Sequence, residues 1–315
     1  MQQNQILTIT LNPALDISTE VAEVTAGPKL RCTHPVVDPG GGGLNVSRAI
    51  RNLGGRSLAL VALAGATGAR LQELLTAEGI DFVAIPAPGE TRQSVTVTES
   101  VSGRQFRFML PGPEWAEAAQ ARVFARLSDL VRPGGIAVIS GSQPPGVPPD
   151  FPGRMAAAMA GMEVVLDTSG AALTEAVARP IPALALLRMN AEEAEGLTGE
   201  PLVGRGHTAD FASDLVARGV ARQVIVARGE DGSILAEAGR RIWVQPPRVE
   251  VVSKVGAGDS FVGGWVLSRA RGLGTEQALT TAVAAAAAAV TSAGTDLCHA
   301  EDVARIAAAC TMGTI

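Results

Sequence analysis

Residues 255–261 read Val255-Gly256-Ala257-Gly258-Asp259-Ser260-Phe261. They follow a strand-like run, Val249-Glu250-Val251-Val252, and they open an apolar helical pattern. A turn of small residues at a helix N-terminus suits an anion, because bare backbone amides point at the ligand and the helix dipole favours negative charge. The order of strand, turn and helix predicts a phosphate-binding turn within an α/β fold.

Asp259 distinguishes this turn from an ordinary phosphate loop. A carboxylate beside an anion site is repelled by the anion, so its presence calls for a chemical reason. A base that accepts the proton of a hydroxyl attacking the bound phosphate is such a reason. We therefore predict that Asp259 is the base and that the amides of Gly256, Ala257 and Gly258 form an anion hole. The alternative is an N-cap aspartate after a glycine-rich turn.

Strands and helices are expected to alternate along the chain. Short, continuous apolar runs are typical of parallel strands buried on both faces, and they occur at residues 6–11, 59–63, 136–140, 164–167, 183–187 and 223–227. Helical patterns lie between them, for example at 45–53, 69–78, 114–131 and 208–218. Right-handed βαβ connections then give a doubly wound, mostly parallel sheet flanked by helices, with its sites at the carboxyl ends of the strands.

Two segments depart from this rhythm. Residues 17–37 and 93–110 alternate apolar and polar side chains with a period of two, as in Ser94-Val95-Thr96-Val97-Thr98. This pattern predicts antiparallel strands that form a small sheet beside the main one. Because no linker, repeat or boundary divides the chain, we expect a single domain over residues 1–315, with the two segments as a lid.

Composition narrows the classes of function. The net charge is −5 and the pI is about 5.4, which argues against a nucleic-acid partner because such a partner needs a basic face. Cys32, Cys298 and Cys310 are scattered without metal spacing, so no disulfide framework is predicted. The most apolar run, at 282–290, is too short to span a bilayer, and residues 1–5 lack the features of a signal peptide. We expect a cytoplasmic protein without a membrane partner.

A second glycine-rich element precedes the first long helix and reads Asp38-Pro39-Gly40-Gly41-Gly42-Gly43-Leu44-Asn45. Four consecutive glycines leave the backbone bare, which is useful where a ligand approaches closely. A dinucleotide-binding loop would need a third glycine at its proper spacing and an acidic residue about 20 positions later, and both are missing. A sugar site fits better, because Asn45 offers a donor and an acceptor to hydroxyl groups.

With these elements the chain resembles the ribokinase/PfkB family of carbohydrate kinases over nearly its whole length. The matching motifs are Asn12-Pro13-Ala14-Leu15-Asp16, the glycine run through Asn45, Ile139-Ser140-Gly141-Ser142-Gln143-Pro144-Pro145-Gly146, Asn190-Ala191-Glu192-Glu193 and the turn at 256–259. The resemblance implies a ribokinase-like fold with a small antiparallel β lid. It also implies phosphoryl transfer from ATP to a sugar, with Mg²⁺ as the metal.

Within the family the chain looks most like the minor-type 6-phosphofructokinases, on Lys29-Leu30-Arg31-Cys32, the glycine run and Thr91-Arg92-Gln93. This implies that ATP and fructose 6-phosphate give fructose 1,6-bisphosphate and ADP. Fructose 1-phosphate and tagatose 6-phosphate are the alternative acceptors. A silent family member that binds sugar phosphate or nucleotide as a sensor is the alternative of another class. The intact turn at 256–259 favours the enzyme, because a silent relative would be free to lose it.

The resemblance also implies a sugar-phosphate site. Asp16 would accept hydrogen bonds from sugar hydroxyls, the glycine run and Asn45 would line the sugar, and Ser142 would close its other side. A phosphorylated sugar needs cations for its phosphate group. The cations in or beside the two lid segments are Lys29, Arg31, Arg92 and Arg107.

On the nucleotide side, the resemblance makes Asn190 and Glu193 the element that positions Mg²⁺ and its waters. Mg²⁺ keeps several waters, so few direct protein ligands are expected. Without the family, Glu193 is an ordinary carboxylate in the first turn of a helix. Gly229 and Gly232 match the nucleotide loop, and Arg188 stands where a lysine is more usual and keeps the positive charge there.

Lys254 stands where family members have a small hydroxyl residue before the turn. Many members hold a monovalent cation, often K⁺, on backbone carbonyls near that turn and near Ala293-Gly294. A lysine could contact a nucleotide phosphate or replace the charge of the cation, so dependence on K⁺ stays open. The family also implies a homodimer that pairs the lid strands, whose exposed edges need cover.

Overall fold

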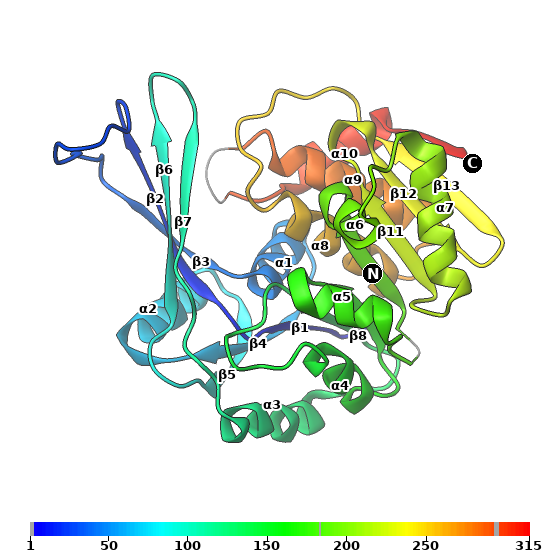
Figure 1. Ribbon diagram of the computed structural model, residues 1–315, viewed down its shortest axis with the longest axis horizontal. Helices are drawn as coiled ribbons and strands as arrows, with labels where there is room; N and C mark the ends of the chain where they lie inside the picture. Colours follow the sequence, from blue (N-terminus) through cyan, green and yellow to red (C-terminus); the bar gives the residue numbers. More distant parts are fainter. Residues whose placement is uncertain (1–2, 183, 293–295) are drawn as a thin grey trace.

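The computed structural model describes residues 3–182, 184–292 and 296–315, and it shows a large sheet with helices on both faces and a smaller sheet at one end (Figure 1). The large sheet has the strand order β14-β13-β12-β11-β10-β9-β8-β1-β4-β5. Its strands are β1 (Ile6–Thr10), β4 (Leu58–Leu63), β5 (Asp81–Pro86), β8 (Ile136–Ser140), β9 (Glu163–Asp167), β10 (Leu186–Asn190), β11 (Gln223–Ala227), β12 (Ser233–Glu237), β13 (Arg240–Gln245) and β14 (Thr311–Thr314).

Parallel pairing runs without a break from β5 to β11, and β12, β13 and β14 then continue the sheet antiparallel. This confirms the doubly wound, mostly parallel sheet. All five residues of β1 are buried, because β1 lies between β8 and β4 and is covered on both faces. A mostly apolar run is what such an interior parallel strand requires.

Ten α-helices lie within the described residues: α1 (Gly42–Asn52), α2 (Gly65–Ala77), α3 (Glu117–Leu130), α4 (Phe151–Ala158), α5 (Gly170–Ala178), α6 (Ala191–Thr198), α7 (Gly204–Ala217), α8 (Ala257–Ala270), α9 (Thr275–Ala289) and α10 (Ala300–Ala309). Helices α3 to α7 share a core with one face of the sheet, which includes Leu7 and Ile9. Helices α1, α8 and α9 share a core with the other face, which includes Ile6. Alternate residues of one strand thus enter opposite layers. No helix of the described chain is long and apolar enough to cross a membrane.

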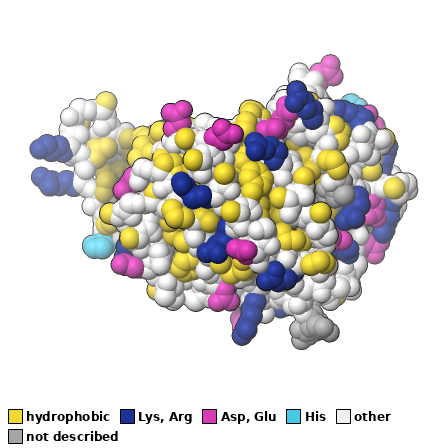
Figure 2. Space-filling model, turned by 90° about the horizontal axis from the view of Figure 1, so that it is seen from below, with side chains coloured by type: hydrophobic (Ala, Val, Ile, Leu, Met, Phe, Trp, Pro, Cys, Tyr) yellow, Lys and Arg dark blue, Asp and Glu magenta, His cyan; other side chains and the backbone are white. Residues whose placement is uncertain are grey.

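The smaller sheet forms the lid. Its strand order is β3-β2-β6-β7, and its strands are β2 (Ala14–Val21), β3 (Val36–Gly40), β6 (Arg92–Glu99) and β7 (Gln105–Met109). Two of its three pairings are antiparallel, as predicted, whereas β2 and β6 pair in parallel. Residues 22–35, within the first predicted lid segment, form an irregular connection rather than a strand. The lid projects from one end of the molecule, with basic side chains near its tip (Figure 2).

Two strand predictions need correction. The run Val249 to Val252, expected as the strand before the phosphate turn, forms no strand, and its last two valines are more than half exposed. The strand predicted at 183–187 is β10, which lies three residues further along, at Leu186–Asn190. Residue 183 lies outside the described part of the chain. The apolar run marked only the beginning of β10, because its last residues include the polar Arg188 and Asn190 of the site.

Candidate active site

Several of the predicted site residues meet near the carboxyl ends of the parallel strands. Asn45 in the first turns of α1 and Asp259 in the first turn of α8 meet there, although they are 214 positions apart in the sequence. Nδ2 of Asn45 donates a hydrogen bond to Oδ2 of Asp259 at 2.9 Å. The two glycine-rich elements of the sequence therefore form one site.

Asp259 has the properties of a base that works near neutral pH. Burial raises its pKa from 3.8 to about 7, and the negative charges of Asp167 and Asp16 act in the same direction. The hydrogen bond from Asn45 and the positive charge of Arg188 oppose this rise. Gly256, immediately before α8, has a φ of 74°, in the left-handed region that glycine adopts without strain. This conformation turns the chain so that the helix starts with free backbone amides beside the carboxylate.

Asp16 lies in β2 at the base of the lid. Burial raises its pKa from 3.8 to about 6, against the charges of Arg92, Arg107 and Arg48 and a hydrogen bond from Ser94. Arg92 begins β6, and its Nε donates to the carbonyl of Asn12 at 3.2 Å. Arg107 in β7 is exposed yet near enough to Asp16 to lower its pKa. The structure thus brings Asp16, Arg92 and Arg107 together.

The glycine run is bare for reasons of packing as well as access. A Cβ on Gly40 would lie 2.1 Å from Oδ2 of Asp16, and one on Gly42 would lie 2.4 Å from Oγ of Ser140. A Cβ on Gly43 would lie 2.6 Å from the carbonyl oxygen of Ile9. Gly41 alone has a positive φ, of 117°. The run therefore lets α1 begin directly against β1, β8 and the Asp16 carboxylate.

Arg188 lies beneath the phosphate turn. A Cβ on Gly258 would be 3.2 Å from Nη1 of Arg188, and the same Nη1 is 3.1 Å from Oδ1 of Asp167. Both side chains of this ion pair are 12% exposed, and the guanidinium also lies 5.6 Å from the ring centre of Phe261. Asp167 was not selected from the sequence, although it ends a correctly predicted apolar run. A carboxylate at the carboxyl end of a parallel strand is the signal that could have identified it.

Asn190 and Glu193 form a capping box at the start of α6. Oδ1 of Asn190 accepts from the Glu193 amide, and Oε2 of Glu193 accepts from the Asn190 amide, each at 2.8 Å. Burial raises the pKa of Glu193, and the negative charge of Asp167 adds to the rise. The motif thus caps the N-terminus of α6. It also places the Glu193 carboxylate close enough to Asp167 for the two negative charges to repel each other.

The remaining predicted nucleotide contacts lie further along the same edge. Gly229 begins a short 3-10 helix (Gly229–Asp231), and Gly232 follows it with a φ of 90°. A Cβ on Gly232 would lie 2.1 Å from the carbonyl oxygen of Val244, so only glycine fits. Lys254 is exposed in the loop before the turn. Ala293 and Gly294, predicted near a K⁺ site, lie outside the described residues.

Two predicted sugar-site residues are not joined to the others, and a third is connected to Arg92 only through Asn12. Lys29 and Arg31 are exposed in the irregular connection at 22–35, and neither makes a hydrogen bond or ion pair within the described chain. Ser142 is exposed, and its Oγ accepts from Nδ2 of Asn12 at 3.1 Å. Their proximity to a sugar phosphate stays a prediction.

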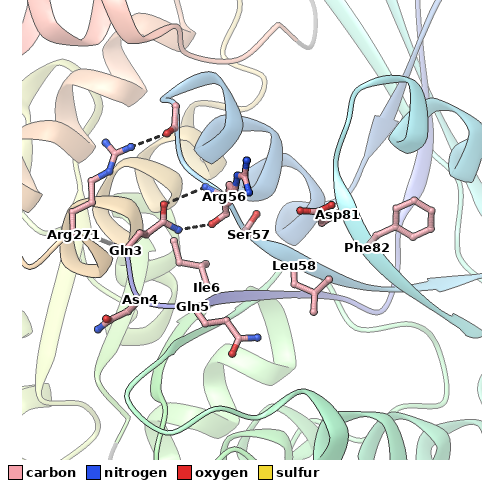
Figure 3. Close-up of a pocket in the computed structure, with 11 residues that line it drawn as sticks. Gln3, Asn4, Gln5, Ile6, Arg56, Ser57, Leu58, Asp81, Phe82 and Arg271 are labelled. Carbon is pink, nitrogen blue, oxygen red and sulfur yellow. Dashed lines mark hydrogen bonds between the residues drawn. The ribbon is translucent and has the colours of Figure 1, made fainter. Parts of the chain in front are cut away.

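A separate cavity of about 780 Å³ lies at the opposite edge of the sheet. It is lined by residues at the amino ends of three strands, among them Ile6, Leu58 and Asp81 (Figure 3). None of the predicted site residues lines it. Its size alone does not make it the active site, because ligands of open α/β sheets bind at the carboxyl ends of the strands.

Comparison with known proteins shows which family has this sequence and fold. A family model described as pfkB family carbohydrate kinase matches residues 9–302. The chain is 37% identical over 304 residues to ATP-dependent 6-phosphofructokinase isozyme 2 of Escherichia coli, covering 96% of this chain and 97% of that protein. It is 32% identical over 263 residues to 1-phosphofructokinase of Xanthomonas campestris, covering 82% of each.

Among solved structures, the chain is again similar to a phosphofructokinase. Phosphofructokinase-2 from Escherichia coli, in complex with substrates and products, matches with a TM-score of 0.91 at 37% identity, over 97% of this chain and 99% of that one. The same E. coli protein also has structures in complex with potassium and in a tetrameric inhibited form.

Proposed function

The chain belongs to the pfkB family of carbohydrate kinases, and from this premise we propose that it transfers the γ-phosphoryl group of ATP to the C1 hydroxyl of fructose 6-phosphate. The products are fructose 1,6-bisphosphate and ADP. The observation that carries the proposal is Asp259: a carboxylate with a pKa raised to about 7, set beside the first amides of α8 and hydrogen-bonded to Asn45. A pKa near the working pH suits a group that must accept a proton and release it again.

In this reaction Asp259 orients the acceptor hydroxyl and takes its proton as the bond to phosphorus forms. Phosphoryl transfer has a loose transition state, so aim and electrostatic stabilisation contribute more than base strength. The amides of Gly256, Ala257 and Gly258 would face the charge that builds on the transferred group, and each such donor is worth about 3 kcal/mol. Arg188, beneath the turn, adds a fixed positive charge.

Asp16 would bind the sugar hydroxyls, and Arg92 and Arg107 would face its phosphate. The proximity of both arginines to Asp16 supports this assignment. Lys29 and Arg31 would add positive charge if the lid closed over the sugar. Gly40 lies against Asp16, and Asn45 is hydrogen-bonded to Asp259. The glycine run and Asn45 would therefore line the sugar between these two carboxylates.

Mg²⁺ is the metal we propose for the nucleotide. Asp167 and Glu193 are two oxygen donors in one another's field, which suits a hard cation. Mg²⁺ usually keeps several waters and binds through one or two carboxylates and the substrate phosphates, so these two side chains would be enough on the protein side. When bound with ATP, the metal neutralises charge on the phosphates.

The experiment is an acceptor panel that measures ADP release with MgATP. Fructose 6-phosphate, fructose 1-phosphate, tagatose 6-phosphate and fructose serve as acceptors, each with and without K⁺. The highest kcat/KM on fructose 6-phosphate supports the proposal. A higher value on another phosphosugar keeps the mechanism and changes the acceptor. No turnover with any of them, with ligand still bound, supports a sensor. The K⁺ arms test whether Lys254 takes the place of the cation.

We further propose that two chains pair through their lids. Several large apolar side chains of the lid are exposed, namely Val36, Val101, Phe108, Met109 and Leu110. The outer strands β3 and β7 are also unpaired edges of the lid sheet, and such edges need cover. Light scattering should give at least twice the 32.2 kDa of one chain, and Phe108→Glu should lower that mass. A wild-type mass of one chain would contradict the pairing.

A further inference from the structure

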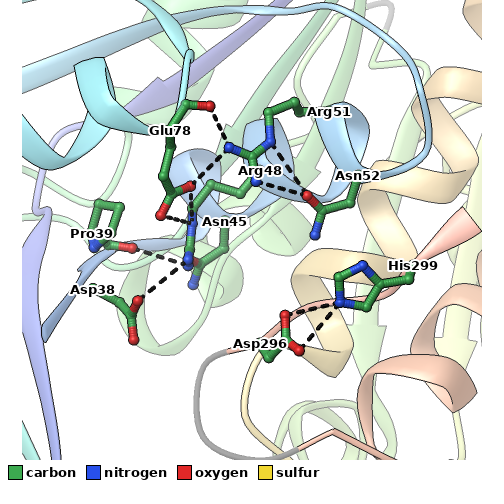
Figure 4. Close-up of polar contacts among 9 residues, drawn as sticks. All are labelled: Asp38, Pro39, Asn45, Arg48, Arg51, Asn52, Glu78, Asp296 and His299. Carbon is green, nitrogen blue, oxygen red and sulfur yellow. Dashed lines mark hydrogen bonds and ion pairs between the residues drawn. The ribbon is translucent and has the colours of Figure 1, made fainter. Parts of the chain in front are cut away.

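Arg48 was not selected from the sequence, yet it lies at the centre of the polar contacts behind the glycine run (Figure 4). Asn45 and Arg48 are three residues apart in α1, so their side chains lie on the same side of the helix. They are 7% and 8% exposed. A buried guanidinium is rare unless it is paired, so its partners explain its position.

Asn45 connects Arg48 to the base. Its Nδ2 donates to Oδ2 of Asp259 at 2.9 Å, and its Oδ1 accepts from Nη1 of Arg48 at 3.4 Å. A guanidinium can only donate and an ionised carboxylate can only accept. The two partners together therefore permit a single orientation of the carboxamide, with the amide nitrogen on Asp259.

Two other elements fix Arg48. Its Nε donates to Oε2 and Oε1 of Glu78, at 2.8 and 3.1 Å. Its Nη1 also donates to the carbonyl of Pro39 at 3.3 Å, and its Nη2 lies 3.7 Å from Oδ1 of Asp38. Glu78 is the C-cap of α2, and the other two partners belong to β3, the strand that leads into the glycine run. The guanidinium thus ties α1 to the elements on either side of it.

We propose that Arg48 is a positioning residue of the active site: it holds the Asn45 carboxamide in the orientation that aims Asp259 at the acceptor hydroxyl. The inference rests on the proposed function of Asp259. The other charged groups that act on Asp259 are Asp167, Arg188 and Asp16. All three remain unchanged in every variant proposed below. The competing explanation is that Arg48 only clamps α1 to α2 through Glu78.

A double-mutant cycle separates the two explanations. We would measure kcat and KM, with the best acceptor of the panel, for the wild type, Arg48→Met, Asn45→Ala and the double variant. Loss of aim should lower kcat of Arg48→Met between about tenfold and a hundredfold, with a smaller change in the KM of the acceptor. In the Asn45→Ala background, Arg48→Met should have almost no further effect on kcat. Additive losses in kcat would overturn the inference.

Arg51 is the matched control. It lies in the same helix, and its Nη1 is 3.5 Å from Oε2 of the same Glu78, but no contact joins it to Asn45. Arg51→Met should therefore keep kcat within about twofold. A loss of kcat equal to that of Arg48→Met would show that the Glu78 clamp alone matters, and it would overturn the inference.

Arg48→Lys guards against a variant that does not fold. Lysine keeps a positive charge for Glu78, but it lacks the planar fork that reaches Glu78, Pro39 and Asn45 together. Its melting temperature should lie near that of the wild type, while kcat stays low. Wild-type kcat in Arg48→Lys would overturn the inference. If the wild type itself shows no turnover on any acceptor, the proposed function falls and this inference with it.

Discussion

Replacement of Asp259 by asparagine should raise stability and abolish most of the turnover. Burial raises the pKa of Asp259 from 3.8 to about 7, so the folded protein keeps a proton that the unfolded chain releases between those two values. Stability is therefore lost as the pH rises through this window, and above pH 7 the loss is complete. At about 1.4 kcal/mol per pH unit, a shift of about three units corresponds to about 4 kcal/mol.

Asparagine is neutral at every pH and escapes this loss. Its Oδ1 could still accept the hydrogen bond that Nδ2 of Asn45 gives to Asp259. The Asp259 side chain is partly accessible, so solvent screens part of the effect, and we expect a gain of roughly 2 kcal/mol at pH 8. The gain should shrink toward zero as the pH approaches 4. Urea unfolding at pH 5, 6.5 and 8 measures it, with the exposed Asp214→Asn as a control that should show no such trend.

Turnover should move in the opposite direction. Loss of a base lowers kcat by about a hundredfold to ten-thousandfold, while calorimetry should still detect binding of MgATP and the acceptor. ADP release by Asp259→Asn within tenfold of the wild-type rate would refute the assignment of the base. If the difference in unfolding free energy between Asp259→Asn and the wild type does not change between pH 5 and 8, burial does not raise the pKa of Asp259 as we infer.

Three further outcomes follow from the site. The kcat/KM for fructose 6-phosphate should fall as the pH drops below about 7, where Asp259 takes up a proton. It should fall more steeply below about 6, where Asp16 also takes up a proton, and Asp16→Asn should remove this steeper part of the pH profile. Gly40→Ala should raise the KM of the sugar phosphate at least tenfold, because its Cβ would lie 2.1 Å from a carboxylate oxygen of Asp16; an unchanged KM contradicts this. Gly232→Ala should raise the KM of ATP and leave that of the sugar unchanged, because its Cβ would strike the carbonyl of Val244.

Much of the fold could be predicted from the sequence, because a parallel strand that is buried on both faces appears as a short run of mostly apolar residues. The apolar runs at β1, β4, β8, β9 and β11 were identified as strands on that basis. The same rule was wrong at Val249 to Val252, where three valines and a glutamate are partly exposed in a loop. A short run does not by itself show whether other elements cover it.

In the candidate site, the sequence singled out residues whose type and setting suggest a chemical role, and it missed residues that are marked only by their contacts in the fold. Asp259 stood out because a carboxylate within a glycine turn is unusual. Asp167 ended a predicted strand and looked ordinary, since only the fold places it against Arg188 and in the field of the base. Arg48 was not singled out, because its burial depends on contacts with β3 and α2 that the pattern of its own helix does not reveal.

Asn45 and Asp259 are 214 positions apart, so the two sides of the proposed site are also synthesised at different times. The chain leaves the ribosome from the N-terminus, at roughly 5–20 residues per second, so the sugar side of the site emerges many seconds before the base. A nascent chain that has not yet released α8 has Asp16 and the glycine run but lacks Asp259, the base of the proposed mechanism. If that mechanism holds, such a chain cannot transfer a phosphoryl group, and catalysis waits until α8 has joined α1.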